Sequence, residues 1–252
     1  QAAELLRDVL WGSCYASVVT SATLRALGSF QTLQRETGIP DFAHFMTVAG
    51  AFDYQQAAVI RVPADAVEGN QADAHTRYII DHFAEYEEPH CGTLVLFSSR
   101  RQMEQVYDDL SSELQKNILI QGQLSNREMV RLHKERIDQG RTSVLMGLAS
   151  FAEGVDLPGD YCRHVVIAKL PFAVPDDPLH EALSEWIEAG GGNSFFDISL
   201  PIASLRLVQA CGRLLRTEKD TGTVTILDKR LITKRYGTQL LNGLPPFRRE
   251  IG

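Results

Sequence analysis

The stretch that decides the fold reads GTLVLFSSRRQMEQVYDDL, residues 92–110. Residues 92–98 form an apolar run of strand length, and the apolar positions that follow take helical spacing. These later positions are Met103, Val106, Tyr107, Leu110 and Leu114. A strand that leads directly into a helix is the repeating unit of α/β proteins, so this stretch predicts an α/β fold.

The same alternation recurs along the chain. Further apolar runs of strand length, several of them β-branched, lie at 16–20, 57–62, 117–121, 142–147, 164–169 and 222–227. Helical patterns lie between them, and Ser125 and Glu128 form a possible capping box at the start of one. We predict a mostly parallel sheet with helices on both faces, with ligands at the carboxyl ends of its strands.

Composition limits the possible functions. The chain has 252 residues, 44% of them hydrophobic, and a net charge of −7, which argues against a generally basic nucleic-acid coat. Its four cysteines are far apart, so neither a zinc site nor a cysteine-held cluster can be read from them. We find no signal peptide or membrane-spanning run, and expect a cytosolic protein with reduced thiols.

The octapeptide 209–216 carries the strongest chemical pattern. On a helix, Gln209, Arg213 and Arg216 share one stripe, while the apolar residues around them occupy the other side. Guanidinium groups bind phosphate in bidentate fashion, and Gly212 lets another group approach closely. The alternative is an exposed face whose arginines pair with acids, at about 0–1 kcal/mol per pair.

Polar residues also follow two of the predicted strands. Gly154 lies between the carboxylates Glu153 and Asp156, which could accept hydroxyl hydrogen bonds or orient an arginine, and the glycine permits a backbone geometry that other residues resist. Ser98, Ser99 and Arg100 could meet a phosphate, or simply cap a helix. The sequence 228–230, Asp-Lys-Arg, could be a site or a charged turn.

Taken in order, the segments 19–24, 94–100, 150–157, 209–216 and 226–230 resemble motifs III to VI of superfamily-two helicases. They are similar to the XPD-like iron–sulfur helicases, and especially to the DinG type. The resemblance implies a RecA-like fold with a small helical insertion at about 175–200. It also implies a motif III strand and junction at 1–35, with the second motor domain at 36–252.

The resemblance further implies an ATP-dependent DNA helicase or translocase of 5′→3′ polarity, acting in DNA repair or replication. The chain has no Gly-Lys pair for a phosphate loop, no Asp-Glu pair for magnesium and no clustered cysteines. We therefore expect a first motor domain of the same polypeptide, absent from this chain, to hold ATP and Mg²⁺. A 4Fe–4S cluster, if any, would belong to the full-length protein, and this chain alone should be inactive.

Site residues follow from the matching motif positions. Arg213 and Arg216 would face the γ-phosphate, and Gln209 would position the attacking water. Glu153, Gly154, Asp156 and Gly212 would belong to the nucleotide cleft, with Asp156 reaching the ribose. Ser98, Ser99 and Arg100 would lie along the DNA backbone. Thr20, Ser21 and Thr23 would couple the two motor domains; no metal-ligating residue is predicted.

The expected partners are single-stranded DNA, or forked or hybrid duplexes, and the first motor domain. We expect a monomer in the bacterial cytoplasm, associated with the nucleoid and not with a membrane. Two alternatives remain: a non-catalytic RecA-like module that binds nucleic acid or protein, and an independent nucleotide-binding enzyme. No G-x-G-x-x-G follows a strand, which disfavours the second alternative.

Three local features can also be predicted from the sequence. A surface loop followed by an amphipathic helix is expected over residues 64–88. Leu179, Leu183, Trp186 and Ile187 have helical spacing, which favours core packing for Trp186 over base stacking. The tail from Leu244 onward contains Pro245-Pro246 and is expected to fray.

Overall fold

The computed structural model describes residues 2–152, 154–172 and 178–252, and for 178–180 only the backbone. The chain divides into two compact units. Unit 1 comprises Gln1–Ala51 and Ala173–Leu205, and unit 2 comprises Phe52–Phe172 and Arg206–Gly252. The predicted junction at 1–35 falls in unit 1.

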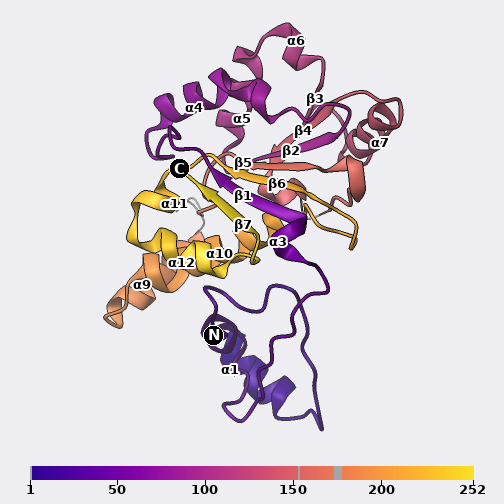
Figure 1. The fold of residues 1–252 in the computed structure, drawn as a ribbon. Coiled ribbons are helices and arrows are strands. Elements are labelled where there is room, and N and C mark those ends of the chain that lie inside the picture. The colour runs from indigo at the N-terminus through magenta and orange to yellow at the C-terminus, as the bar shows by residue number, and fades with distance from the viewer. Residues whose placement is uncertain (1, 153, 173–177) are drawn as a thin grey trace. The chain divides into compact units, whose positions relative to one another are not determined.

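Unit 2 is built on a seven-stranded sheet in which every pairing is parallel, as Figure 1 lets the reader follow. The strand order is β3-β4-β2-β5-β6-β1-β7. The strands are β1 (Ala58–Val62), β2 (Gly92–Phe97), β3 (Ile118–Ile120), β4 (Ser143–Leu148), β5 (His164–Ile167), β6 (Gly222–Ile226) and β7 (Arg248–Ile251). This confirms the predicted α/β class and six of the seven predicted strands.

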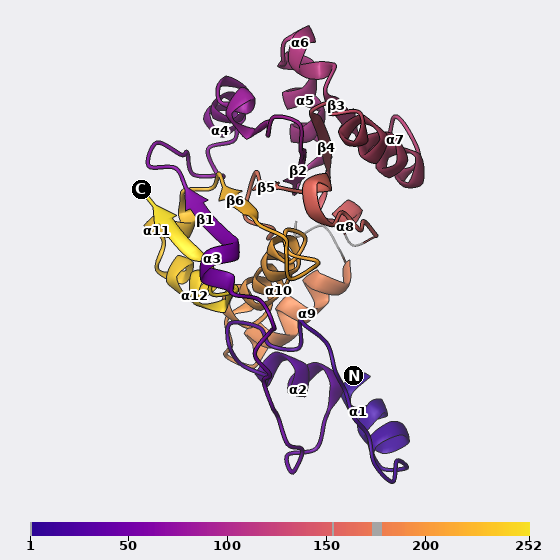
Figure 2. The same cartoon turned by 45° about the vertical axis from the view of Figure 1, so that its right-hand side comes forward.

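The central strands are buried on both faces. Every residue of β2 is buried, because β4 and β5 flank it and helices cover it above and below. In Figure 2 these strands lie between α4 (Ala72–Asp81) and α5 (Arg100–Asp109) on one side, and α7 (Asn126–Asp138) and α8 (Ala149–Ala152) on the other. The predicted helices on both faces are therefore confirmed.

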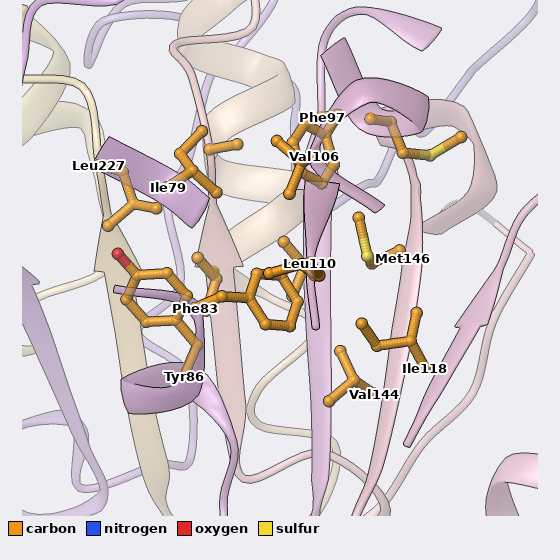
Figure 3. Close-up of a cluster of buried hydrophobic side chains, with 14 of the residues drawn as sticks. Ile79, Phe83, Tyr86, Phe97, Val106, Leu110, Ile118, Val144, Met146 and Leu227 are labelled. Atoms are coloured by element: carbon orange, nitrogen blue, oxygen red, sulfur yellow. The ribbon is translucent and has the colours of Figure 1, made fainter. Parts of the chain in front are cut away.

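One face of the sheet carries the cluster drawn in Figure 3. Alternate residues of β2, Val95 and Phe97, pack there with side chains from α4, α5 and the short helix η2 (Phe83–Tyr86). Ile79 and Phe83 in this cluster are fully buried, which confirms the loop and amphipathic helix predicted over 64–88. Burying such a side chain contributes about 1.5–3 kcal/mol.

Serine caps fix where two of the helices begin. Ser99 Oγ accepts from Gln102 N at 3.4 Å at the start of α5, and Ser125 Oγ accepts from Glu128 N at 3.3 Å at the start of α7. The single helix predicted from Met103 to Leu114 is wrong. Leu110 is extended, and α6 (Ser112–Gln115) begins afresh because Ser111 caps it.

The C-terminal tail is a second correction, since it does not fray. Its last residues form β7, which pairs with β1 through Ile60 opposite Arg249. Arg61 and Glu250 add an ion pair of 2.9 Å across these two strands. The remaining elements of unit 2 are α3 (Tyr54–Ala57), η3 (Gly159–Tyr161), α11 (Arg230–Thr233) and α12 (Arg235–Gly243).

Unit 1 is helical in its described part. It contains α1 (Ala2–Leu6), η1 (Arg7–Trp11), α2 (Gln31–Thr37), α9 (Pro178–Ala189), η4 (Phe195–Ser199) and the first half of α10 (Leu200–Cys211). The strand predicted at 16–20 is wrong: these residues are irregular and exposed, because no strand pairs with them. Core packing of Trp186 is also wrong, since its side chain is 56% exposed while Ile187 is buried.

Candidate nucleotide and nucleic-acid site

The candidate residues of unit 2 gather around the carboxyl ends of the parallel strands. Ser98 follows β2, the segment 149–157 follows β4, Lys169 follows β5 by two residues, and Asp228 follows β6. In a parallel sheet all these ends lie along one edge, which is where α/β proteins bind ligands.

The two arginines of the octapeptide do not lie on a helix. Helix α10 ends at Cys211, and the chain tightens through hydrogen bonds from Arg213 N to Ala210 O (3.1 Å) and from Leu214 N to Cys211 O (3.2 Å). The predicted single helical stripe is therefore wrong. Four of the five residues predicted for the apolar side, Leu207, Cys211, Leu214 and Leu215, are buried, and Val208 is half-buried.

A loop after β4 brings the arginines together instead. Arg213 Nη1 donates to the carbonyl oxygen of Val155 at 3.2 Å, and Arg216 Nε donates to Asp156 Oδ1 at 2.8 Å. The Asp156 side chain is 67% exposed, so this ion pair is worth about 0–1 kcal/mol. A contact this weak can be exchanged for one with a phosphate group.

Asp220, which the sequence analysis did not single out, holds the Arg216 loop in place. Its buried carboxylate accepts four hydrogen bonds: from Arg216 N (2.7 Å), Thr217 N (2.8 Å), Thr217 Oγ1 (2.6 Å) and Gly159 N (3.1 Å). Burial alone would raise the pKa of Asp220, but these bonds outweigh it and hold the pKa below its usual range. The carboxylate thus links the Arg216 loop to the end of the Asp156 loop.

Asp228 has a similar function after β6. The carboxylate is fully buried and accepts from Gly69 N (3.0 Å) and Leu170 N (3.1 Å). Arg230 Nη2 forms an ion pair of 2.6 Å with it, and the guanidinium lies 5.5 Å from the Phe172 ring. Burial raises the pKa of Asp228, but Arg230 and the amide donors together lower it. The Asp-Lys-Arg segment is thus an anchor between strand ends.

The segment after β2 forms the capped start of α5. Ser99 is the cap, and Arg100 Nη1 lies 3.8 Å from Glu104 Oε1. Arg100 also lies beside Gly122, where a Cβ would come within 3.2 Å of Nη1. Both serines and Arg100 therefore stand at the carboxyl edge, and their contact with DNA stays a prediction.

The comparisons with known proteins now bear on this arrangement. The sequence pattern that defines the helicase C-terminal domain matches residues 84–247. The chain belongs to the helicase C-terminal domain family. Its relatives include DinG helicases and its structural neighbours include XPD helicases, in line with the resemblance in motif order.

Two curated relatives illustrate the similarity. The chain is 44% identical over 251 residues to the ATP-dependent DNA helicase DinG of Photobacterium profundum, covering 98% of this chain and 36% of that protein. It is 39% identical over 250 residues to DinG of Escherichia coli O6:H1, covering 97% of this chain and 35% of that protein. The chain thus spans about a third of the length of the curated relatives it matches.

Solved structures agree on the fold. An XPD helicase without ligand has a TM-score of 0.56 at 19% identity, covering 80% of this chain and 40% of that chain. The Xpd4 structure of S. tokodaii has a TM-score of 0.56 at 16% identity, covering 85% and 43%. These likenesses show the fold alone, which is the predicted RecA-like architecture.

The structure places three of the four remaining residues predicted for the nucleotide cleft. A Cβ at Gly154 would meet nothing within 4 Å, so no close contact there requires a glycine. A Cβ at Gly212 would lie 3.4 Å from Val208 O, an ordinary contact. Gln209 is half-buried on α10, and Glu153 lies outside the described residues.

The predicted coupling residues belong to unit 1. Thr20, Ser21 and Thr23 lie in an irregular segment, where Thr23 N donates to Ser21 Oγ at 3.2 Å. Their coupling role stays a prediction.

Two further findings concern metals and membranes. Across the described ranges, no group of three or more His, Cys, Asp or Glu side chains could hold a metal ion. In the same part of the chain, no helix is both long and apolar enough to span a bilayer.

Proposed function

We propose that this helicase C-terminal domain supplies the arginine fingers of an ATP-dependent DNA helicase, whose ATP is bound at an interface with a first motor domain. The meeting of Arg213 and Arg216 at the Val155–Asp156 loop carries the proposal. The two segments are about 60 residues apart in sequence. Two guanidinium groups beside the Asp156 loop, at the carboxyl ends of the parallel strands, suit the stabilisation of a phosphoryl group during transfer.

The chemistry assigns a role to each residue. Hydrolysis spreads negative charge over the γ-phosphoryl oxygens, and the guanidiniums of Arg213 and Arg216 neutralise it. Arg216 would exchange its contact with Asp156 for a phosphate oxygen, which frees the Asp156 carboxylate for the ribose. Gln209 would orient the attacking water. An arginine finger contributes roughly 10³–10⁵ in rate, or about 4–7 kcal/mol at the barrier.

Glu153, Gly154 and Gly212 complete the nucleotide cleft in this proposal. Ser98, Ser99 and Arg100 contact the DNA backbone, while Thr20, Ser21 and Thr23 transmit closure between the motor domains. Closing on ATP and opening after hydrolysis would then move single-stranded DNA with 5′→3′ polarity. We place the activity in DNA repair or replication, on single strands, forks or hybrids, in a monomer of the nucleoid-containing cytoplasm.

The described side chains do not fit the family's metal groups. Burial raises the pKa of Cys162 and Cys211 to about 12, which favours neutral thiols over the thiolates that a 4Fe–4S cluster requires. Among the described side chains, no three or more His, Cys, Asp or Glu lie together as a metal-binding group. We therefore assign Mg²⁺ to the first motor domain and any cluster to other parts of the protein.

ATP turnover tests the proposal. Hydrolysis is measured with and without single-stranded DNA for this chain and for a longer protein that joins it to a first motor domain. The chain alone should be silent, and DNA-stimulated turnover of the longer protein should fall at least 10³-fold in Arg213→Ala, with ATP binding retained. The matched control is Arg141→Ala, which removes an exposed arginine just before β4, at the opposite edge of the sheet. Turnover by the chain alone, or loss of ATP binding in Arg213→Ala, contradicts the proposal.

One observation also favours a non-catalytic binding module. Arg213 and Arg216 already have partners within the chain, as a purely structural loop requires. In that case the longer protein binds single-stranded DNA but does not hydrolyse ATP in any condition.

A further inference from the structure

The sheet reverses its strand order between β2 and β5. From β2 the chain continues to β3 and β4 on one side, and then crosses to β5 and β6 on the other side of β2. The loops after β2 and β5 therefore diverge, and a crevice at the carboxyl ends of these two strands follows from the topology. Neither the arginine pair nor the Asp156 loop accounts for what this crevice binds.

A small cavity lies at this point. Its volume is about 10 Å³, which is the space of a single water molecule. Its polar lining side chains are Ser98 after β2, Lys169 after β5 and Arg206 from α10, and Phe97, Ile167 and Pro171 are among its apolar ones. A cavity of this size has no room for a nucleoside, and most of its lining is apolar, so a charged ligand group would meet the three polar side chains at its rim.

The charges around the cavity favour an anion. Arg206 is exposed and uses Nη1 for a long bond to the carbonyl oxygen of Pro171 at 3.4 Å, which leaves other N–H groups of its fork for a ligand. Asp228, the nearby carboxylate, is already neutralised by Arg230. Lys169 and Arg206, both cationic, are therefore the charged side chains that line the cavity.

The surroundings of Lys169 leave its ammonium group poorly stabilised. Burial, followed by repulsion from Arg230, lowers the pKa of the Lys169 ammonium, and Asp228 opposes this shift. A negatively charged ligand near Nζ would stabilise the charged form.

We propose that Lys169 and Arg206, with the Ser98 hydroxyl, form a phosphate site for a single-stranded nucleic acid at the β2–β5 switch point. The proposal deepens the proposed function, on which it rests, by adding two cations to the predicted DNA contacts of Ser98, Ser99 and Arg100. A phosphodiester strand can place one oxyanion against Ser98, Lys169 and Arg206 at the rim of the cavity while its sugars and bases remain outside. The small volume therefore favours a strand over a nucleotide held whole.

The test measures binding of a fluorescein-labelled oligo(dT) 20-mer, and separately of ATP, to this chain by anisotropy and calorimetry. Lys169→Gln and Arg206→Gln each remove one cation at the site. Arg141→Gln is the matched control, since it removes an exposed cation just before β4, at the opposite edge of the sheet. Thermal unfolding checks that each variant is folded.

The site predicts a specific dependence on salt. Loss of one phosphate contact should lower the slope of log K against log[salt] by about 0.7, because fewer counterions are released. Affinity for the oligonucleotide should fall about three- to tenfold in Lys169→Gln and Arg206→Gln and less than twofold in Arg141→Gln. The chain alone should show no binding of ATP in any of the variants, because the proposed nucleotide site needs the first motor domain.

Three other results would contradict the proposed phosphate site, and each points to a different explanation. Equal losses in all three variants indicate a general charge effect. Binding of ATP by the unchanged chain that is lost in Lys169→Gln and Arg206→Gln would indicate a nucleotide phosphate at the site. If the unchanged chain binds no oligonucleotide, the site is refuted, while the arginine-finger proposal stands or falls on turnover of the longer protein.

Discussion

Asp220 provides the sharpest test of how the Arg216 loop is held. Replacement by alanine removes the acceptor of four hydrogen bonds, with distances of 2.6–3.1 Å. Bonds to a charged acceptor are worth about 1.5–3 kcal/mol each, so the four set a ceiling of roughly 6–12 kcal/mol. The real cost must be smaller, because Arg216 and Thr217 are exposed and water can replace the lost acceptor.

Most of the cost therefore comes from the half-buried Gly159 N–H and from the loss of loop order. We expect Asp220→Ala to lower the free energy of unfolding by about 2–4 kcal/mol. Asp220→Asn should cost less, because its amide keeps one acceptor oxygen while its NH₂ faces a donor. Asp108→Ala is the control, since Asp108 is exposed on α5 and should change the free energy by under about 0.5 kcal/mol.

Urea unfolding followed by circular dichroism measures these differences, and pH adds a second check. Because the folded pKa of Asp220 is lowered, its stabilisation is complete above the ordinary aspartate pKa and disappears as pH falls through the folded value. The gap between the unchanged chain and Asp220→Asn should therefore be constant from pH 6 to 8 and narrow in acid. Asp220→Ala no less stable than Asp108→Ala refutes the reasoning.

The remaining predictions concern stability. Gly92→Ala should destabilise by about 3 kcal/mol, because its Cβ would lie 2.0 Å from Tyr161 O, whereas Gly154→Ala should be nearly neutral; equal melting temperatures contradict this. Burial lowers the pKa of His133 and His164 to about 4, below the 6.5 expected in the unfolded chain. The unfolded state therefore binds more protons below pH 6.5, and moving from pH 7 to 5 should cost about 2 kcal/mol per histidine. Urea unfolding at both pH values checks this, and His133→Gln should lose less stability on acidification than the unchanged chain.

Much of the fold could be predicted because its causes are local. Six strands were identified from short apolar runs, and Ser99 and Ser125 start helices because each side chain bonds an amide three residues ahead. The errors occurred where strand formation depends on a partner strand that is distant in sequence. Residues 16–20 have strand composition but no neighbouring strand, and residues 248–251 form β7 because β1 offers an open edge.

The residues of the candidate site likewise include some that the sequence predicts and some that it does not. The order of the motifs predicts Arg213, Arg216 and Asp156 as site residues, because a motif is defined by its residue types. It gives no signal for Asp220, or for Lys169 and Arg206 of the proposed phosphate site, because their surroundings arise only on folding. The spacing from Thr217 to Asp220 was a usable clue to Asp220, since such short polar turns favour side-chain bonds to nearby backbone amides.

By itself, the sequence determined the α/β class, the positions of most elements and the family of this helicase domain, because periodicity, capping and motif order are properties of neighbouring residues. Tertiary structure alone decided that α10 stops at Cys211, that Arg216 meets Asp156 and that Asp220 ties two loops together. The reason is that these contacts join residues about 60 positions apart, and only the folded sheet brings them within hydrogen-bonding distance.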